Sequence, residues 1–444
     1  MTITILGLGP GDPRALTLEA REVLQDTREI FLRTREHPTA AALPEHLRVH
    51  SFDHLYETLN GFDAIYTAIA DDIIARGARG DVLYAVPGHP LFGETSVQEI
   101  LAQARAKSIA THIVAGVSFV DAACAALGLD PLARGLQIAD ATELARQHLP
   151  RLDPDQPALI GQLHSRAVAS DCKLTLFALY PPEHVVTRID AAGTADQKIA
   201  TMSLAELDHE EHWATTQGCP YMMTTLFVPP LPRPSSLNSL TEIIAHLRAP
   251  DGCAWDRQQT HQSLRQDLLE ECYEVLETLD ADDIPHLREE LGDLLLIVLM
   301  QVQIASEAGE FLLSDVVADI AAKLVRRHPH VFADVKVSGT AEIVTNWERI
   351  KQEENGGKQK RAHIPRALPA LARAQKVAKK VSTNRNELTN LREIARRVEK
   401  LPRARNREKA LGEVLFALAA YAAAKHVDAE GALRTVSHRL EADG

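Results

Sequence analysis

Apolar residues recur three or four positions apart between residues 264 and 302, which is the spacing of one helix face. The run DADDIP interrupts this pattern, and Pro285 suits the first turn of a second helix. A short break of this kind predicts two helices that return antiparallel as a hairpin. The apolar stripe consists of Leu264, Leu268, Leu269, Val275, Leu276 and Leu279 in the first helix, and of Leu287, Leu291, Leu294, Leu295, Val298 and Val302 in the second.

Two acidic pairs lie beside this stripe, Glu271 with Glu274 on the first helix and Glu290 with Asp293 on the second. Residues three apart share a helix face, so each pair points one way and its like charges repel. A single pair is best interpreted as the solvated face of an amphipathic helix. Two pairs that meet across a hairpin favour a bound divalent cation, and hard oxygen ligands select Mg²⁺ or Mn²⁺.

The first half of the chain follows a different pattern, in which short apolar runs alternate with helical ones. ITILGLGPGDP opens as a strand that enters a turn containing Gly7, Gly9 and Gly11, and LTLEAREVLQ continues as a helix. Such alternation predicts an α/β domain built on a sheet. The glycine turn is a weak dinucleotide fingerprint, because its spacing is GxGxG and prolines interrupt it. Further runs include REIFLRT, DVLYAVPGHPLFGE, HIVAGVSFVDAACAALGLD, PALIGQLHS and KLTLFALYP.

Two stretches indicate linkers. FVPPLPRPSSLNSLTE is rich in proline and serine and cannot continue a helix or a central strand. Within it, Ser239 fits a helix N-cap with Glu242 three residues later. A second break, ENGGKQKRAH, precedes an alanine-rich segment. The predicted boundaries are residues 1–228 for the α/β domain, 229–238 for the first linker, 239–355 for the all-α domain, 356–366 for the second linker and 367–444 for the last helical segment.

Composition narrows the expected partners and compartment. The 444 residues exceed what one core usually supports, so two or three domains are expected. The net charge of −13 argues against a surface that coats a nucleic acid polymer, and no such partner is expected. The five scattered cysteines form no CxxC motif, which favours neither a disulfide framework nor a zinc knuckle. Without a signal peptide or an 18-residue apolar run, a cytoplasmic protein with no membrane association is expected.

The motif EExxE followed by ExxD across a helical hairpin resembles the MazG family, the all-α nucleoside triphosphate pyrophosphohydrolases. SLTEIIAHLRAPDGCAWDRQQTHQSLRQDLLEE and DVVADIAAKLVRRHPHVF extend the resemblance on both sides, over about a quarter of the chain. The resemblance implies hydrolysis of a nucleoside triphosphate to the monophosphate and pyrophosphate. It also implies that Glu271, Glu274, Glu290 and Asp293 hold Mg²⁺, with Glu270 supporting these ligands or activating water.

The same resemblance implies roles for residues beside the hairpin. Gly252–Asp256 resembles the family's GCPWD loop, with Ala254 in place of proline, and such a loop borders the nucleotide. A core position is the alternative for Trp255. Cations at the end of a later helix suit triphosphate oxygens, with a helix-dipole interaction as the alternative. Trp347 suits either a nucleotide base or packing against a helix. The implied substrate-binding residues are Trp255, Asp256, Lys323, Arg326, Arg327 and Trp347.

Three segments of the first half resemble the tetrapyrrole (corrin and porphyrin) methylases, which bind S-adenosylmethionine between two α/β lobes. GLGPGDPRALT resembles the family's first loop, DVLYAVPGHP a strand and turn, and AGVS a third segment. S-adenosylmethionine is therefore the second cofactor implied. The alternative is that the glycines only form tight turns. The implied cofactor-binding residues are Gly7, Gly9, Gly11, Asp12, Pro87, Gly88, Gly116 and Ser118.

The last segment resembles a second, degenerate copy of the MazG hairpin. LGEVLF at residues 411–416 parallels LGDLLL at residues 291–296, so Glu413 corresponds to Asp293. An EExxE cluster is missing from this copy, and one carboxylate pair cannot hold the metal. The apolar stripe persists, so the segment is expected to pack against the first copy or to form a homodimer seam in the helical part.

The sequence thus predicts a cytoplasmic protein with an α/β methylase-like half and an all-α MazG-like half. The expected activity is Mg²⁺-dependent hydrolysis of nucleoside triphosphates, and the first half is expected to bind S-adenosylmethionine. A second hypothesis is a methyltransferase whose helical half is accessory. A third is a non-catalytic protein in which either half senses its ligand and regulates the other.

Overall fold

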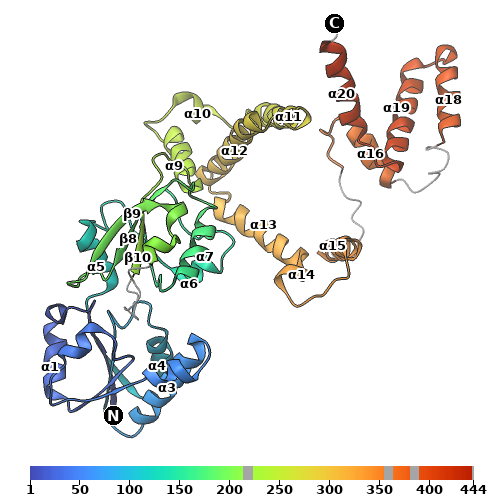
Figure 1. The fold of residues 1–444 in the computed structure, drawn as a ribbon. Helices are drawn as coiled ribbons and strands as arrows, with labels where there is room; N and C mark the ends of the chain where they lie inside the picture. Colours follow the sequence, from blue (N-terminus) through green and yellow to red (C-terminus); the bar gives the residue numbers. More distant parts are fainter. Residues whose placement is uncertain (214–223, 355–363, 381–389, 443–444) are drawn as a thin grey trace. The chain divides into compact units, whose positions relative to one another are not determined.

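The computed structural model describes residues 1–213, 224–354, 364–380 and 390–442. The chain forms two compact units, Met1–Ile243 and Ile244–Gly444. Strands are confined to the first unit, and the described part of the second unit contains helices and turns (Figure 1). The predicted division into an α/β part and a helical part is confirmed.

The first lobe of the α/β unit is a five-stranded parallel sheet in the order β3-β2-β4-β1-β5. The opening strand β1 alternates its side chains between two cores, with Ile3 and Ile5 on one face and Leu6 on the other. Helices cover both faces, as a parallel sheet requires. These elements are β1 (Thr2–Gly7), α1 (Leu18–Asp26), β2 (Glu29–Leu32), β3 (Arg48–Ser51), α2 (Asp53–Thr58), α3 (Phe62–Gly77), β4 (Val82–Val86), α4 (Thr95–Ala106) and β5 (Ala110–Val114).

The second lobe is a mixed five-stranded sheet in the order β6-β7-β10-β8-β9. Only β6 and β7 run parallel, and the other pairs are antiparallel. Its core includes Ile160, Leu176, Val186 and Leu226. The elements are α5 (Phe119–Leu127), β6 (Gln137–Asp140), α6 (Ala141–Ala145), β7 (Ala158–Gly161), α7 (Arg166–Leu176), β8 (Val185–Asp190), β9 (Lys198–Ser203), α8 (Glu210–Trp213) and β10 (Thr224–Val228).

The helical part begins two residues before the predicted cap. Helix α9 spans Leu237–Arg248, and the Ser236 hydroxyl accepts a hydrogen bond from the Ser239 amide at 3.0 Å. Ser239 as the N-cap is therefore wrong. The Asp155 carboxylate accepts the Ser235 and Ser236 amides at 2.8 and 3.0 Å, and this contact from a distant loop fixes where the helix begins.

The predicted hairpin is confirmed. The first helix ends at Asp280, and the Asp283 carboxylate caps the second helix by accepting the His286 amide at 3.2 Å. Pro285 lies in the first turn, where its missing amide proton costs nothing. The helices of this region are α10 (Ala254–Gln258), α11 (Arg265–Asp280), α12 (Ile284–Glu307), α13 (Leu313–Arg327), α14 (Pro329–Phe332) and α15 (Thr340–Glu354).

The last helices form a small bundle of their own, in which α16 and α18 both pack against α19. Small side chains of α19, among them Ala417, Ala419 and Ala420, are buried there. Among the described residues no single helix is long and apolar enough to cross a membrane; α19 and α20 pass that test only as a pair, bent by 110°. The helices are α16 (Ala370–Lys380), α18 (Leu391–Lys400), α19 (Arg407–Ala424) and α20 (Ala429–Ala442).

Candidate functional site: an acidic hairpin and a glycine cradle

The helical hairpin brings carboxylate oxygens of Glu271, Glu274 and Glu290 within 4.8 Å of one another. The first two residues come from α11 and the third from α12. Asp293, one turn after Glu290, lies close enough to raise the pKa of Glu271 and of Glu290. Glu270 is exposed on α11 and is not part of the group of three. The structure therefore brings three of the four predicted ligands together on the hairpin, with Asp293 close enough to influence their charge.

Electrostatics at this place favour a cation. Burial raises the pKa of the Glu271 carboxyl, and the charges of Glu274, Asp293 and Glu290 raise it further. Burial also raises the pKa of Glu290, followed by the charges of Glu274 and Asp293. Carboxyls whose pKa is raised by like charges bind a proton or a metal more tightly than isolated ones. These residues fit Mg²⁺, which prefers hard oxygen ligands in a negative environment.

Arg248, which the sequence analysis did not single out, anchors the loop predicted to border the nucleotide. Its guanidinium is almost buried and forms an ion pair with Glu307 at 2.7 Å. The same group donates hydrogen bonds to the backbone oxygens of Asp256 and Gln259. Trp255 is 65% exposed, which excludes the core position for this residue. In the sequence, Arg248 is marked only by its position as a basic residue at the end of a predicted helix, directly before the loop.

The predicted phosphate-binding cations lie at the end of α13, where two of them bind a glutamate. Arg326 and Arg327 form ion pairs with Glu354 of α15 at 2.7 and 2.5 Å. The arginine hydrogen bonds lower the pKa of Glu354 to about 2. Arg327 and Lys351 also lie over the Trp347 ring, 5.3 and 4.8 Å from its centre. These contacts join α13 to α15.

Lys323 lies one turn earlier on α13. It lines an open groove in which apolar and acidic side chains alternate. The other lining residues are Phe311, Asp315, Val316, Asp319 and Ile320.

Removing the Glu354 charge tests whether the arginines bind phosphate. In Glu354→Gln, Arg326 and Arg327 lose their anionic partner and are available to triphosphate oxygens. We expect KM for the nucleotide to fall about threefold to tenfold, because guanidinium–phosphate bonds are charge-assisted. Glu353→Gln is the matched control, since Glu353 pairs with Arg349 on the same helix at 2.6 Å. An unchanged KM with a lower thermal midpoint would mean that the pairs only join the two helices.

A glycine cradle lies at the carboxyl edge of the first sheet. Gly7 ends β1, Gly88 follows β4 and Gly116 follows β5, and their backbones touch. A Cβ added at Gly116 would lie 2.2 Å from the Gly88 oxygen, and one added at Gly7 would lie 2.5 Å from the same atom. Gly9 and Gly88 exchange backbone hydrogen bonds at 3.1 and 2.8 Å, and both have positive φ. The structure thus brings together the three segments that the resemblance singled out.

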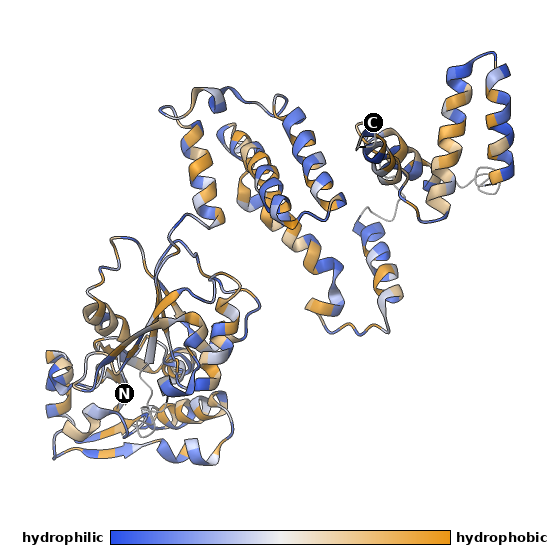
Figure 2. Ribbon diagram, turned by 45° about the horizontal axis from the view of Figure 1, so that its top comes forward, coloured by the Kyte–Doolittle hydropathy of each residue, from blue (hydrophilic) through white to orange (hydrophobic). Residues whose placement is uncertain are grey.

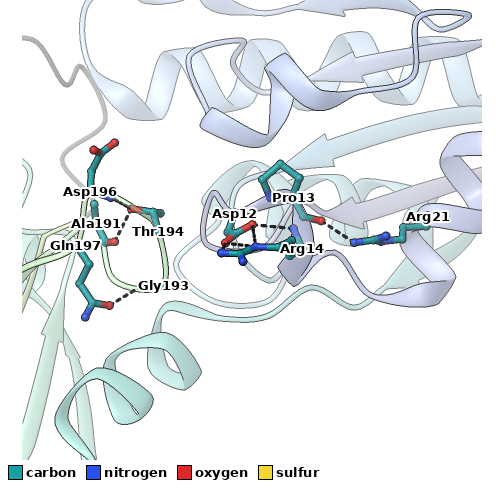
Figure 3. A network of polar contacts seen from close by, with 9 residues as sticks. All are labelled: Asp12, Pro13, Arg14, Arg21, Ala191, Gly193, Thr194, Asp196 and Gln197. Atoms are coloured by element: carbon teal, nitrogen blue, oxygen red, sulfur yellow. Dashed lines mark hydrogen bonds and ion pairs between the residues drawn. The ribbon is translucent and has the colours of Figure 1, made fainter.

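The remaining predicted cofactor-binding residues lie in the first loop or beside the cradle. Asp12 binds the Arg14 guanidinium at 2.7 Å, and this bond lowers the pKa of Asp12 (Figure 3). The loop contacts the β8–β9 turn, where a Cβ added at Gly193 would lie 3.1 Å from a Pro10 carbon. Gly11, in the same loop, has a φ of +119°.

Two predicted cofactor-binding residues lie outside the first loop. Pro87 lies between β4 and Gly88. Ser118 caps α5 through a capping box with Asp121, so its hydroxyl serves the helix.

A buried ion pair borders this cradle and was missed from sequence. Arg33, which follows β2, donates its amide to the Ala85 oxygen of β4 at 2.9 Å. Its guanidinium lies 3.6 Å from the carboxylate of Glu94, which is 6% exposed. Burial raises the pKa of Glu94 to about 7, although Arg33 lowers it. A charged residue directly after an apolar strand, as in REIFLRT, was the available signal.

Comparisons with known proteins identify the two regions that contain the acidic hairpin and the glycine cradle. The family model described as "MazG nucleotide pyrophosphohydrolase domain" matches residues 259–332. The model described as "Tetrapyrrole (Corrin/Porphyrin) Methylases" matches residues 2–208. The nucleoside triphosphate pyrophosphohydrolase of Escherichia coli (strain K12) is 38% identical over 223 residues, which cover 47% of this chain and 85% of that protein.

The chain belongs to the MazG family. Its MazG region contains the acidic hairpin, and a tetrapyrrole methylase-like domain precedes it, so both resemblances inferred from sequence are confirmed. The same two-part arrangement extends over "Uncharacterized protein YabN" of Bacillus subtilis (strain 168), which is 38% identical over 384 residues, covering 85% of this chain and 76% of the relative. The solved uroporphyrin-III-C-methyltransferase of Thermus thermophilus covers 51% of this chain and 91% of its own, at 24% identity and a TM-score of 0.39.

Proposed function

We propose that the MazG region hydrolyses nucleoside triphosphates to nucleoside monophosphates and pyrophosphate with Mg²⁺ as cofactor. The observation that carries the proposal is the convergence of Glu271, Glu274 and Glu290 beside Asp293, in a chain that belongs to this family. Nucleoside triphosphates are the substrates named for several MazG relatives, including the Escherichia coli protein. These relatives support a nucleotide substrate for the same hairpin here.

Each residue has a definite part in this proposal. The carboxylates of α11 and α12 hold the cation in one place because they project from two packed helices. A bound Mg²⁺ supplies positive charge to the phosphates and lowers the pKa of a water molecule. Arg248 keeps the loop of Trp255 and Asp256 in place, and Lys323, Arg326 and Arg327 contribute positive charge for the triphosphate. Attack of water on the α-phosphorus then releases pyrophosphate.

A panel of canonical and modified nucleoside triphosphates tests the proposed reaction. The full-length protein is incubated with each nucleotide and Mg²⁺, and the products are separated and identified. We expect equal amounts of monophosphate and pyrophosphate, with both absent when a chelator replaces Mg²⁺. Release of inorganic phosphate and a nucleoside diphosphate would contradict cleavage between the α and β phosphates.

The raised carboxyl pKa values predict a pH-dependent effect of the metal. The folded state binds protons at Glu271 and Glu290 more tightly than the unfolded state, because both pKa values are raised. Without metal, this contribution to stability is full below the ordinary carboxyl pKa and is lost as the pH rises through the raised pKa.

Mg²⁺ competes with these protons, so the rise in thermal midpoint on adding Mg²⁺ should grow as the pH rises above the ordinary carboxyl pKa. Thermal melts with Mg²⁺ or with a chelator, at several pH values, measure this difference. The double variant Glu274→Gln/Glu290→Gln should show no such growth. If Mg²⁺ raised the thermal midpoint equally at the lowest and the highest pH, this result would contradict a metal site on the hairpin.

For the first domain we propose binding of S-adenosylmethionine at the glycine cradle. The support is the close approach of three backbone segments at the carboxyl edge of a parallel sheet, where ligands bind in open α/β sheets. Calorimetry on the full chain should show saturable binding that Gly9→Val removes, because φ is +69° there and a Cβ would meet the Ala15 oxygen at 3.3 Å. Transfer of a labelled methyl group would favour the methyltransferase hypothesis.

We also propose that the helical region forms a homodimer. Apolar side chains on its hairpin and on α13 are between two and three fifths exposed, among them Leu279, Leu291, Ile320 and Leu324. Surfaces of this kind mark protein interfaces. We expect light scattering to give twice the chain mass, and Leu291→Lys to halve it. Leu132→Lys, in the α/β unit at a residue that is 91% exposed, should leave the mass unchanged.

A further inference from the structure

The charge of this chain is divided unevenly along its length. Residues 1–355 contain 52 acidic and 28 basic side chains, whereas residues 356–444 contain 9 acidic and 20 basic ones. The net charge of −13 therefore conceals a positive C-terminal segment. Such an asymmetry between parts of a chain is typical of a surface that binds a polyanion.

Much of this positive charge lies on one hairpin, which we name the basic hairpin and define as residues Leu391–Lys409. It comprises α18, a 3-10 turn at Leu401–Arg403 and the start of α19 (Figure 1). Figure 2 shows hydrophilic residues along α18 and at the turn between the two helices. Eight of its 19 residues are basic and three are acidic. The basic residues are Arg392, Arg396, Arg397, Lys400, Arg403, Arg405, Arg407 and Lys409, and all except the half-buried Arg397 are exposed.

Arg397 and Lys400 lie in the last turn of α18, where the helix dipole favours a cation, but helix stability does not account for three other positions. Arg392 lies in the first turn of α18, and Arg407 and Lys409 lie in the first turn of α19. Positive charges at a helix N-terminus oppose the helix dipole. Both helices are capped by neutral Asn390 and Asn406, whose side chains accept amide hydrogen bonds at 3.0 Å, and each first turn contains one glutamate, Glu393 or Glu408.

Ion pairs within the hairpin leave most of its charge uncompensated. In the described part of the chain, Arg396 and Arg397 share Glu393, at 3.5 and 3.7 Å. Exposed ion pairs with such long distances contribute little to the stability of the fold. Arg392, Arg396 and Lys400 follow one another at four-residue intervals, so they form a stripe about 12 Å long on one helix face. A stripe of this length exceeds what a single phosphate needs.

We propose that the basic hairpin binds the phosphate backbone of a nucleic acid duplex. The hairpin has no Phe, Trp or Tyr, so it offers no aromatic surface on which unpaired bases could stack. Its chemistry matches recognition through phosphates, which is independent of sequence and sensitive to salt. Ile394 is 4% exposed, so α18 presents only two large apolar side chains to solvent, Leu391 and Val398. This is a small apolar face for insertion into a lipid surface.

The proposal reverses the expectation drawn from the net charge of the whole chain. Charges further apart than about 8 Å are largely screened at physiological salt, so the local charge decides whether a polyanion binds. The acidic first 355 residues therefore do not prevent binding at the hairpin. The proposal is independent of nucleotide hydrolysis, because the basic hairpin contains none of the residues assigned to that reaction.

Fluorescence anisotropy with labelled duplexes of about 20 base pairs tests the proposal over about 50–200 mM salt. We expect the full-length protein to bind duplex DNA or duplex RNA, with an affinity that falls steeply with salt. The triple variant Arg392→Gln/Lys400→Gln/Arg403→Gln should bind at least about tenfold more weakly, with the salt slope reduced by about 0.9 for each lost phosphate contact. Far-UV circular dichroism and the thermal midpoint should be unchanged, which shows that the variant is folded.

The matched control is Arg79→Gln/Arg105→Gln/Lys107→Gln, which removes three exposed cations from the α/β unit. Equal weakening by both triple variants would overturn the proposal, because binding would then follow only total charge. No duplex binding at low salt would also overturn it, as would binding no tighter than to polyglutamate of equal charge. Binding to anionic vesicles without binding to either duplex would assign the hairpin to a membrane surface instead.

Discussion

Glu290→Gln is expected to lose pyrophosphohydrolase activity by about 100-fold or more at saturating nucleotide. The substitution keeps the size of the side chain and removes one of the three carboxylates that lie within 4.8 Å of one another. Because α12 supplies Glu290 while α11 supplies the other two, the loss breaks the link across the hairpin. Initial rates at several Mg²⁺ concentrations measure the effect, and excess Mg²⁺ should restore only part of the activity.

The matched control is Glu413→Gln in the C-terminal bundle. Glu413 lies on α19, at the position that corresponds to Asp293 in the predicted degenerate copy. The structure shows three carboxylates together only on the first hairpin among the residues that it describes. We therefore expect activity to be retained in Glu413→Gln and lost in Asp293→Asn. Equal losses would mean that the C-terminal copy supplies a working ligand.

Gly116→Ala is expected to lower the thermal midpoint of the α/β domain and to weaken cofactor binding there. The new Cβ would lie 2.2 Å from the Gly88 oxygen and 2.9 Å from Gly7, and these neighbours are backbone atoms that cannot rotate away. Forcing extra atoms into a packed site costs about 1–3 kcal/mol. For a domain of this size that corresponds to a fall of about 2–12 °C. Calorimetric melts and titration of S-adenosylmethionine measure the two effects.

Gly80→Ala provides the comparison, because a Cβ at that position meets nothing within 4 Å. Its thermal midpoint should stay the same or rise slightly, since alanine restricts the unfolded chain. If both variants had the same thermal midpoint, the cradle could accommodate a Cβ at Gly116, which would contradict the short backbone distances. If Gly116→Ala melted lower yet bound the cofactor normally, the cradle would be a structural junction only.

The sequence determined the local features of this protein. A 3.6-residue apolar period predicted α11 and α12, and the DADDIP break with Pro285 predicted the turn between them, because helix periodicity and proline geometry act within a few residues. The positions of Glu271, Glu274, Glu290 and Asp293 followed from the same period. The alternation of apolar runs and glycine turns predicted the α/β lobes in the same way.

Contacts between distant segments were decided only by the tertiary structure. Asp155 sets the start of α9 from 80 residues away, which local N-cap preference at Ser239 could not show. Glu354 binds Arg326 and Arg327 from another helix, and Arg248 holds the Asp256 loop through hydrogen bonds to backbone oxygens. The contact of Gly7, Gly88 and Gly116 likewise depends on strand order in the sheet. Such contacts depend on how distant elements pack in the fold, so they cannot be predicted from the spacing of residues along the chain.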